Sequence, residues 1–308
     1  MYPNSSDAKM LGNVSHMAEV QGRSLWADAR ARFFRNRAAV VSLALLIFIA
    51  LFALLGHFVA QYERDYIDFT LIGANAYKGV PSFATGHYFG TDSSGRDLFA
   101  RVVQGTQISL MVGIVGAGVA VIVGTLYGAV AGYVGGRADD IMMRFVDILM
   151  SIPFMFVLIL MLVIFGRSIF MLFLGIGLIS WLDMARIARG QTLTIKNKEF
   201  VEVAHATGVH PAKIILRHIV PNLLGIVIVY ATLLVPTMII FESFISFLGL
   251  GVQEPNTSLG ALISEGAANM NNGVLWQLYF PLIFFVITIF AFFFVGDGLR
   301  DALDPKDR

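Results

Sequence analysis

The sequence contains no cysteine and few charged residues, and both absences narrow the classes of protein to which it can belong. Without cysteine the chain has neither disulfides nor thiolate metal sites. Only 14% of its 308 residues are charged, whereas an ordinary soluble domain carries roughly a quarter. The chain is 57% hydrophobic, with a mean hydropathy of +0.74. This composition excludes an ordinary soluble domain.

The sequence also lacks the short motifs of common enzymes. It has no GxxxxGKS/T phosphate loop, no GxSxG nucleophile elbow and no HExxH zinc pair. Its six histidines are scattered and show no metal-ligand spacing. We therefore expect this chain to have no catalytic residue, no metal site and no cofactor of its own, and not to hydrolyse a nucleotide by itself.

Uncharged apolar runs long enough to cross a bilayer recur along the chain. A helix needs about 20 apolar residues to span the hydrocarbon core. Five runs satisfy this length, and a sixth, Ser168–Leu182, is short at 15 residues. The five longer runs are Ala38–Ala60, Val102–Gly136, Ile148–Gly166, His218–Phe241 and Gly266–Gly296. With the short run included, the sequence predicts an all-α integral membrane protein with six transmembrane helices.

The distribution of lysine and arginine favours six spans and gives them an orientation. With the N-terminus in the cytoplasm, the predicted inner segments hold 17 of these residues and the outer segments hold five, as the positive-inside rule expects. Both termini are then cytoplasmic, and no cleavable signal peptide precedes the first span. The expected organisation is an N-terminal segment 1–37, a first span 38–60, an outer loop 61–101, a core 102–300 that includes a cytoplasmic loop 186–222, and a tail 301–308.

Small residues recur at every fourth position of the second predicted span. They are Gly116, Ala120, Gly124, Gly128, Gly132 and Gly136. On a helix they form one ridge, along which a neighbouring backbone can approach closely. We favour this packing role over a role in lining a pore. Three prolines, Pro153, Pro236 and Pro281, also fall inside predicted spans, where each is expected to bend its helix.

The polar stretch Lys198–Asn222 has the pattern of two short helices joined by a glycine turn. The first helix has one face of four side chains: Phe200, Val203, Ala204 and Thr207. Gly208 is placed to end this helix, and Pro211 fits the first turn of a second one. The second helix runs through Ile214, Ile215 and His218. Two such helices form a compact knob that can dock against a soluble partner.

The residues alone leave a second interpretation of this stretch open. An ordinary amphipathic loop can lie on the lipid headgroups, attracted to anionic lipid through its basic side chains. These are Lys196, Lys198, Lys213 and Arg217.

The same stretch resembles the EAA loop of the permeases of binding-protein-dependent ABC importers. That loop reads E-A-A, three residues, G, nine residues, then I-x-L-P, and it is matched here by Glu202, Ala204, Gly208 and Pro221. Val203 replaces the first alanine, and His218 and Val220 stand at the Ile and Leu positions. The resemblance implies a type I ABC importer permease fold whose cytoplasmic coupling helices fit a groove on an ATPase subunit. The residues implied in coupling are Phe200, Glu202, Ala204, Gly208, Ile215, His218 and Pro221.

Other segments resemble the peptide and nickel subclass of these permeases, in particular the C-type permeases of oligopeptide and dipeptide systems. They are RSLWADARARFFRNRAAVVSL at 23–43, HYFGTDSSGRDLFAR at 87–101, SWLDMARIARGQTL at 180–193, SFLGLG at 246–251 and GDGLRDALDP at 296–305. The resemblance implies import of oligopeptides across the bacterial cytoplasmic membrane, and relatives that carry dipeptides, nickel or glutathione keep those cargoes open. It also implies the partners: a second homologous permease, two cytoplasmic ATPases that hold ATP and Mg, an extracytoplasmic peptide-binding protein, and lipid, with no nucleic acid.

Several acidic residues call for separate interpretations. Glu242 lies inside the fifth predicted span, where a carboxylate is a candidate pathway or gate residue, although it can equally cap backbone groups near Ser246. If Glu242 carried protons, the chain would be a secondary transporter without an ATPase. A non-transport membrane scaffold or enzyme is the third class. We expect Asp147 to pair with Arg144 one helical turn away. Asp92, Arg96 and Asp97 are expected to form a capped, ion-paired turn on the outer face.

Overall fold

The computed structural model describes residues 25–73 and 78–303. The predicted segments 1–37 and 301–308 therefore lie partly outside the described residues. The described part of the chain is helical, and its β contacts are two isolated bridges in the loop that follows the first long helix. In chain order the elements are α2 (Leu25–Arg35), α3 (Arg37–Val59), α4 (Leu98–Val134), α5 (Gly136–Ser151), α6 (Phe154–Phe165), α7 (Ile169–Ile195), α8 (Glu199–Ala206), α9 (Pro211–Ile214), the π-helical η1 (Ile215–Ile219), α10 (Val220–Phe247), α11 (Leu259–Asn269), the 3-10 turn η2 (Met270–Asn272) and α12 (Trp276–Leu303).

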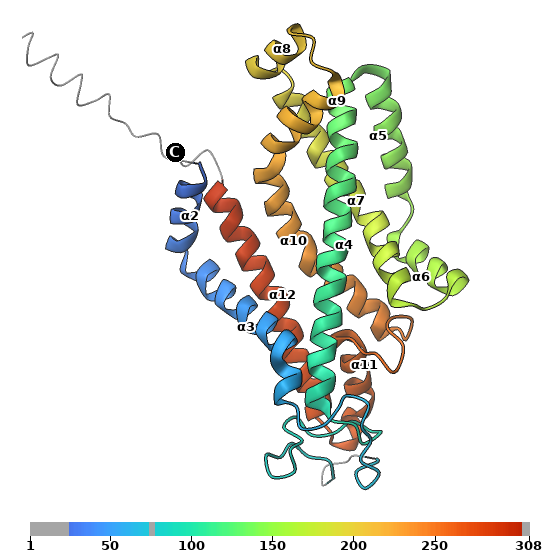
Figure 1. The fold of residues 1–308 in the computed structure, drawn as a ribbon. Helices are drawn as coiled ribbons and strands as arrows, with labels where there is room; N and C mark the ends of the chain where they lie inside the picture. The colour runs from blue at the N-terminus through green and yellow to red at the C-terminus, as the bar shows by residue number, and fades with distance from the viewer. Residues whose placement is uncertain (1–24, 74–77, 304–308) are drawn as a thin grey trace, which may run out of the picture.

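The long helices form one bundle around α4 (Figure 1). Five helices in the described residues are long and apolar enough to cross a membrane, and a sixth span exists if α5 and α6 count together. These two helices meet at an angle of 77°. The predicted all-α membrane fold is confirmed, with the third span present as a bent pair of helices rather than one straight helix.

The glycine ridge of α4 packs against α7, as the packing interpretation predicts. A Cβ atom built on Gly124 would lie 2.5 Å from the Trp181 carbonyl oxygen, and one on Gly132 would lie 2.9 Å from the Arg189 carbonyl oxygen. A Cβ on Gly128 would overlap the Ala185 carbonyl oxygen. Only glycine therefore allows the two backbones this approach. Gly136 does not belong to the ridge, because α4 ends at Val134 and Gly136 begins α5.

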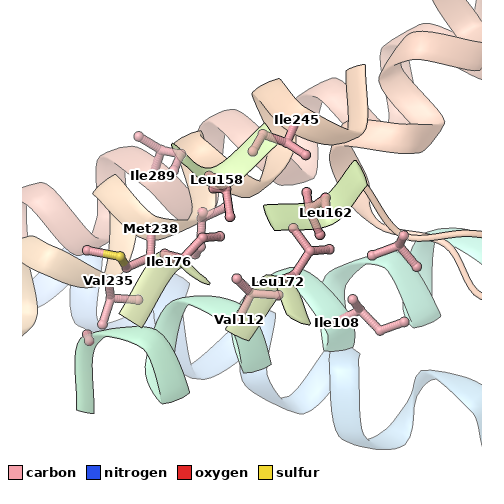
Figure 2. Close-up of a cluster of buried hydrophobic side chains, with 13 residues drawn as sticks. Ile108, Val112, Leu158, Leu162, Leu172, Ile176, Val235, Met238, Ile245 and Ile289 are labelled. Carbon is pink, nitrogen blue, oxygen red and sulfur yellow. The ribbon is translucent and has the colours of Figure 1, made fainter. Parts of the chain in front are cut away.

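A second contact region joins α4 to the remaining core helices through side chains. Figure 2 shows this buried apolar cluster, to which α4, α6, α7, α10 and α12 all contribute. Ile176 of α7 and Met238 of α10 meet there beside Val112 of α4, and all three are at most 1% exposed. Leu158 and Leu162 are the buried residues of α6. One face of α6 is thus fixed to the bundle, while Phe156 and Phe165 on other faces are exposed.

Several predicted boundaries differ from the observed helices, and three of these differences are large. Residues 186–195, expected in the cytoplasmic loop, continue α7, because a helix need not end where the apolar run ends. The expected span Ile148–Gly166 is broken at Pro153, which lies at the start of α6 rather than within a helix. The expected span Gly266–Gly296 is divided between α11 and α12 by a turn of uncharged asparagines and Gly273, whose φ is +77°. Charge and apolar length alone do not detect such uncharged breaks.

The contact between α4 and α7 predicts different results for two glycines of the same helix. Gly128→Ala places a methyl group against the α7 backbone, whereas a Cβ on Gly118 meets no atom within 4 Å. Overpacking of this kind costs about 1–3 kcal/mol. We therefore expect Gly128→Ala to lower the melting temperature of the purified chain in detergent by several degrees and Gly118→Ala to leave it nearly unchanged. Equal melting temperatures would contradict the close contact.

Candidate functional site

The knob begins with α8, which ends in a Schellman motif. The Val209 N–H donates to the Ala204 carbonyl at 3.0 Å, and the Gly208 N–H donates to the His205 carbonyl at 3.0 Å. This pair of bonds requires a left-handed residue after the last helical turn, and Gly208 has φ +77°. The predicted helix end at Gly208 is therefore confirmed, together with the physical reason for glycine at that position.

The second half of the knob is continuous with a membrane-spanning helix. The His210 side chain caps α9 by accepting from the Ala212 N–H at 3.3 Å, and Pro211 occupies the first turn, as predicted. The chain then passes through η1 directly into α10 without a loop. The described helix from Pro211 to Phe247 is thus one continuous unit, so a force on α9 acts on α10 directly.

The inner side of the knob is an apolar core shared with three long helices. Val201 and Ala204 of α8 pack with Ile214 and Ile215 against residues of α4, α7 and α10. Ile219 at the end of η1 is fully buried in the same cluster. Ala204 and Ile215, both predicted as coupling residues, therefore face inward, where they hold the knob to the bundle.

The outer side of the knob exposes apolar side chains. Phe200 is 40% exposed, Val203 is 61% exposed and Leu216 is 60% exposed. The predicted face of α8 is therefore divided, because Ala204 is buried whereas Phe200, Val203 and Thr207 are exposed. Among the other predicted coupling residues, three are exposed and His218 is half-buried; the exposed ones are Glu202, Gly208 and Pro221.

Polar contacts fix the helices beneath the knob. The Lys196 Nζ donates to the Gly132 carbonyl at 2.9 Å, which ties the end of α7 to the last turn of α4. Arg189 of α7 forms an ion pair with the buried Asp139 of α5, with Nη2 2.6 Å from Oδ2.

Asp147 has a different partner from the one expected. It pairs with Arg186 of α7 rather than with Arg144 on its own helix. The prediction was wrong because a residue one turn away is the only partner that a sequence offers, whereas a neighbouring helix brought Arg186 closer.

Glu242 is fully buried between helices. Three serine hydroxyls donate to its carboxylate, at 2.6–3.3 Å: Ser109, Ser243 and Ser246. Ser109 also accepts from the Leu259 N–H at 3.2 Å, and Ser258 donates to Ser246 at 3.2 Å. Glu242 of α10 therefore joins α4 to the N-terminus of α11, where the helix dipole favours a negative group.

The opposite end of the bundle is held by an ion-pair network. Arg101 of α4 is 2% exposed and donates to Asp92 at 2.5 Å and to Glu265 of α11 at 2.7 Å. Arg96 donates to Asp92 at 2.7 Å. Arg96 also donates to Glu254, and this second hydrogen bond lowers the pKa of Glu254 below the usual value. The expected capped, ion-paired turn is present. The link to α11 was not foreseen, since Arg101 and Glu265 are far apart in sequence.

Asp97 caps α4 within this network. Its carboxylate accepts from the Ala100 N–H at 2.9 Å and contacts the His87 Nδ1 at 2.9 Å. Burial raises the pKa of Asp97, and both hydrogen bonds oppose that shift. The loop before α4 is thereby fastened to the first turn of that helix.

A bundle of apolar helices with a helical knob at one end defines a multi-pass membrane protein. The chain belongs to the family of binding-protein-dependent transport system inner membrane components, whose family model matches residues 124–308. A second model, the N-terminal TM domain of oligopeptide transport permease C, matches residues 24–76. The family and the transport role inferred from the EAA-like stretch are confirmed.

Curated relatives match the chain over nearly its whole length. It is 56% identical over 308 residues to the oligopeptide transport system permease protein OppC of Escherichia coli (strain K12), covering 100% of both chains. It is 40% identical to the OppC of Bacillus subtilis (strain 168), covering 99% of this chain and 95% of the relative. The dipeptide transport system permease protein DppC of the same Bacillus strain is 41% identical, over 91% of this chain and 86% of the relative.

The hydrogen bonds of Glu242 predict a stability defect for the isosteric amide. In Glu242→Gln an amide NH₂ replaces one carboxylate oxygen, so at least one serine hydroxyl loses its acceptor. Hydrogen bonds to charged groups contribute about 1.5–3 kcal/mol. We expect a clearly lower melting temperature in detergent, and no change for Glu63→Gln, whose side chain is exposed on the outer loop. An unchanged melting temperature for Glu242→Gln would show that the hydrogen bonds of Glu242 to the three serines do not stabilise the fold.

Proposed function

We propose that this chain is the permease subunit of an ATP-driven importer of oligopeptides, and that the knob of α8 and α9 receives the movement of a separate ATPase. Its family makes it an inner membrane component of a binding-protein-dependent transport system. The observation that carries the proposal is the knob itself. Apolar side chains are exposed on its outer side, and its inner side is built into α4, α7 and α10.

The exposed side of the knob has the character of a protein docking surface. Phe200, Val203 and Leu216 expose apolar area, and exposed apolar patches mark sites of interaction with proteins or membranes. Glu202 of α8 and Gly208, directly after this helix, are also exposed. In this proposal the ATPases hold ATP and Mg, and their closure moves the knob together with the membrane helices.

Oligopeptides are the cargo favoured by the relatives of high identity. The OppC proteins are named for oligopeptide transport, and one of them is 56% identical to this chain. The DppC relative keeps dipeptides as a second candidate, and nickel and glutathione remain as further cargoes within the resemblance. Competition with uptake of a labelled oligopeptide distinguishes these cargoes, since only a true cargo competes at matched concentration.

The complete importer is proposed to contain further subunits. These are a second homologous permease, two cytoplasmic ATPases and an extracytoplasmic peptide-binding protein that delivers the peptide to the outer face. The proposed orientation has both termini and the knob in the cytoplasm, as the distribution of lysine and arginine favours. The ion-paired end with Arg101 then lies outside.

Glu242 is proposed to act as a structural joint rather than as a proton carrier. A carrier must exchange protons with water, whereas this carboxylate is fully buried and accepts three serine hydroxyls. Family membership also places the chain in a system driven by other subunits. Uptake that continues in the presence of an uncoupler but stops on ATP depletion is the expected result.

Mild detergent purification of the tagged chain tests the assembly directly. We expect mass spectrometry to detect a second permease and two ATPases with the chain. A single exposed substitution, Phe200→Ala, should reduce recovery of the ATPases, because it removes an apolar anchor of the knob. Phe69→Ala is the matched control, since Phe69 is 78% exposed in the outer loop. Equal recovery of the ATPases with both variants would remove the knob as their docking site.

Gly208 separates the effect of charge from that of backbone geometry. Asp and Asn both tolerate a left-handed conformation, and a Cβ at Gly208 meets no atom within 4 Å. Both variants should therefore insert and fold, but Gly208→Asp adds a negative charge to the docking surface. We expect Gly208→Asp to lose ATP-driven peptide uptake in proteoliposomes at least tenfold while ATP hydrolysis persists. Gly208→Asn should keep most uptake, and normal uptake by Gly208→Asp would contradict the coupling role.

A further inference from the structure

The helix α2 has two faces of different character, and only one is used by the fold. Ala29 and Phe33, each 8% exposed, pack against α12. The approach is close, since a Cβ on Gly298 would lie 3.3 Å from the Phe33 ring. On the other side Trp26 is 53% exposed and Phe34 is 59% exposed, with Arg30 between them in the helical repeat. This outer stripe has no partner among the described residues in the bundle interior.

The position of α2 places this stripe at the edge of the bilayer. The Asn36 side chain caps α3 by accepting from the Ala39 N–H at 3.2 Å, so α3 begins at Arg37. This helix is one of the candidate spans. Only one residue therefore separates α2 from a membrane-crossing helix. Figure 1 shows α2 beside the C-terminal end of α12, at the left edge of the bundle and toward the same end as α8 and α9.

The chemistry of the stripe matches an anionic lipid headgroup. The described residues of α2 and the first residue of α3 contain one acidic side chain, Asp28, and four arginines: Arg30, Arg32, Arg35 and Arg37. Arginine binds phosphate oxygens through two parallel hydrogen bonds, and exposed tryptophan is typical of the membrane interface. Basic side chains beside a span are attracted to the anionic cytoplasmic leaflet.

We propose that the outer stripe of α2 (Trp26, Arg30 and Phe34), together with the neighbouring Arg35 and with Arg37 at the start of α3, binds the headgroups of anionic phospholipids in the cytoplasmic leaflet. The arginines contact the phosphates, and the two aromatic rings enter the region between headgroups and acyl chains. Bound lipid then holds α2 against α12 from the outside, while Ala29 and Phe33 hold it from the inside. The side of the membrane follows from the proposed orientation, whereas lipid selectivity does not depend on the cargo or on the ATPases.

A photo-cross-linking amino acid in place of Phe34 identifies what touches the stripe. The assembled transporter is placed in nanodiscs of phosphatidylcholine with a minority of phosphatidylglycerol, irradiated, and analysed by mass spectrometry of the cross-linked chain. We expect phosphatidylglycerol adducts several-fold above its fraction in the bilayer, and a smaller excess at high salt because exposed charges are screened. Adducts in proportion to the bulk lipid would overturn the proposal, as would adducts to an ATPase or to the second permease.

Variants of the arginines separate charge from mere proximity to lipid. The triple variant Arg30→Gln, Arg35→Gln, Arg37→Gln should reduce the excess of phosphatidylglycerol adducts to the bulk ratio, and the corresponding lysine variant should restore part of it. The same cross-linker in place of Phe156, which is 71% exposed on α6, should give phosphatidylglycerol adducts in proportion to the fraction of this lipid in the bilayer, with the native arginines and with both variants. An excess retained by the glutamine variant would refute recognition by these arginines. Because the readout is lipid identity, it remains valid even if the proposed cargo is wrong.

Discussion

Glycines at every fourth position of α4 allow the backbone of α7 to lie directly against it, and the positions of the other parts follow from this contact. A methyl group at Gly124, Gly128 or Gly132 would meet the α7 main chain. The helix α7 leads into the knob, so its position sets the position of α8. Lys196, which donates to the Gly132 carbonyl, closes the contact at its last turn. In a bilayer, where lipid tails are as apolar as side chains, such close packing is a main source of helix association.

The two ends of the bundle are built by different forces. At the knob, apolar residues of α8, α9 and η1 share a core with α4, α7 and α10, and further apolar residues remain exposed. At the other end, the buried Arg101 joins α4 to the outer loop and to α11 through Asp92 and Glu265. A buried ion pair is costly to break once one partner is displaced. The end with Arg101 is therefore fastened by directional contacts, whereas the knob keeps apolar side chains exposed.

The sequence carried enough information for the fold class, the glycine ridge and the knob. Each depends on a local pattern: an uncharged run, a period of four, and a glycine followed by a proline. It did not carry the break between α11 and α12, because Asn271, Asn272 and Gly273 are uncharged. It did not show which side of α8 is buried, since Val201 rather than Phe200 meets the core that α4, α7 and α10 provide. The partners Arg186 and Glu265 depend on distant helices, which no local pattern reveals.

Glu242 shows how a general rule and a particular structure combine. A carboxylate inside a span is expensive, which makes it a candidate for function. Here the cost of burying the carboxylate is offset by three serine hydroxyls and by the N-terminus of α11, so Glu242 stabilises the fold. The helix α10 that carries it begins at the end of η1. A displacement of the knob along α10 therefore reaches the joint with α4 and α11 near the opposite end. Through this continuity the buried carboxylate of Glu242 connects the helix that leaves the knob with α4 and α11.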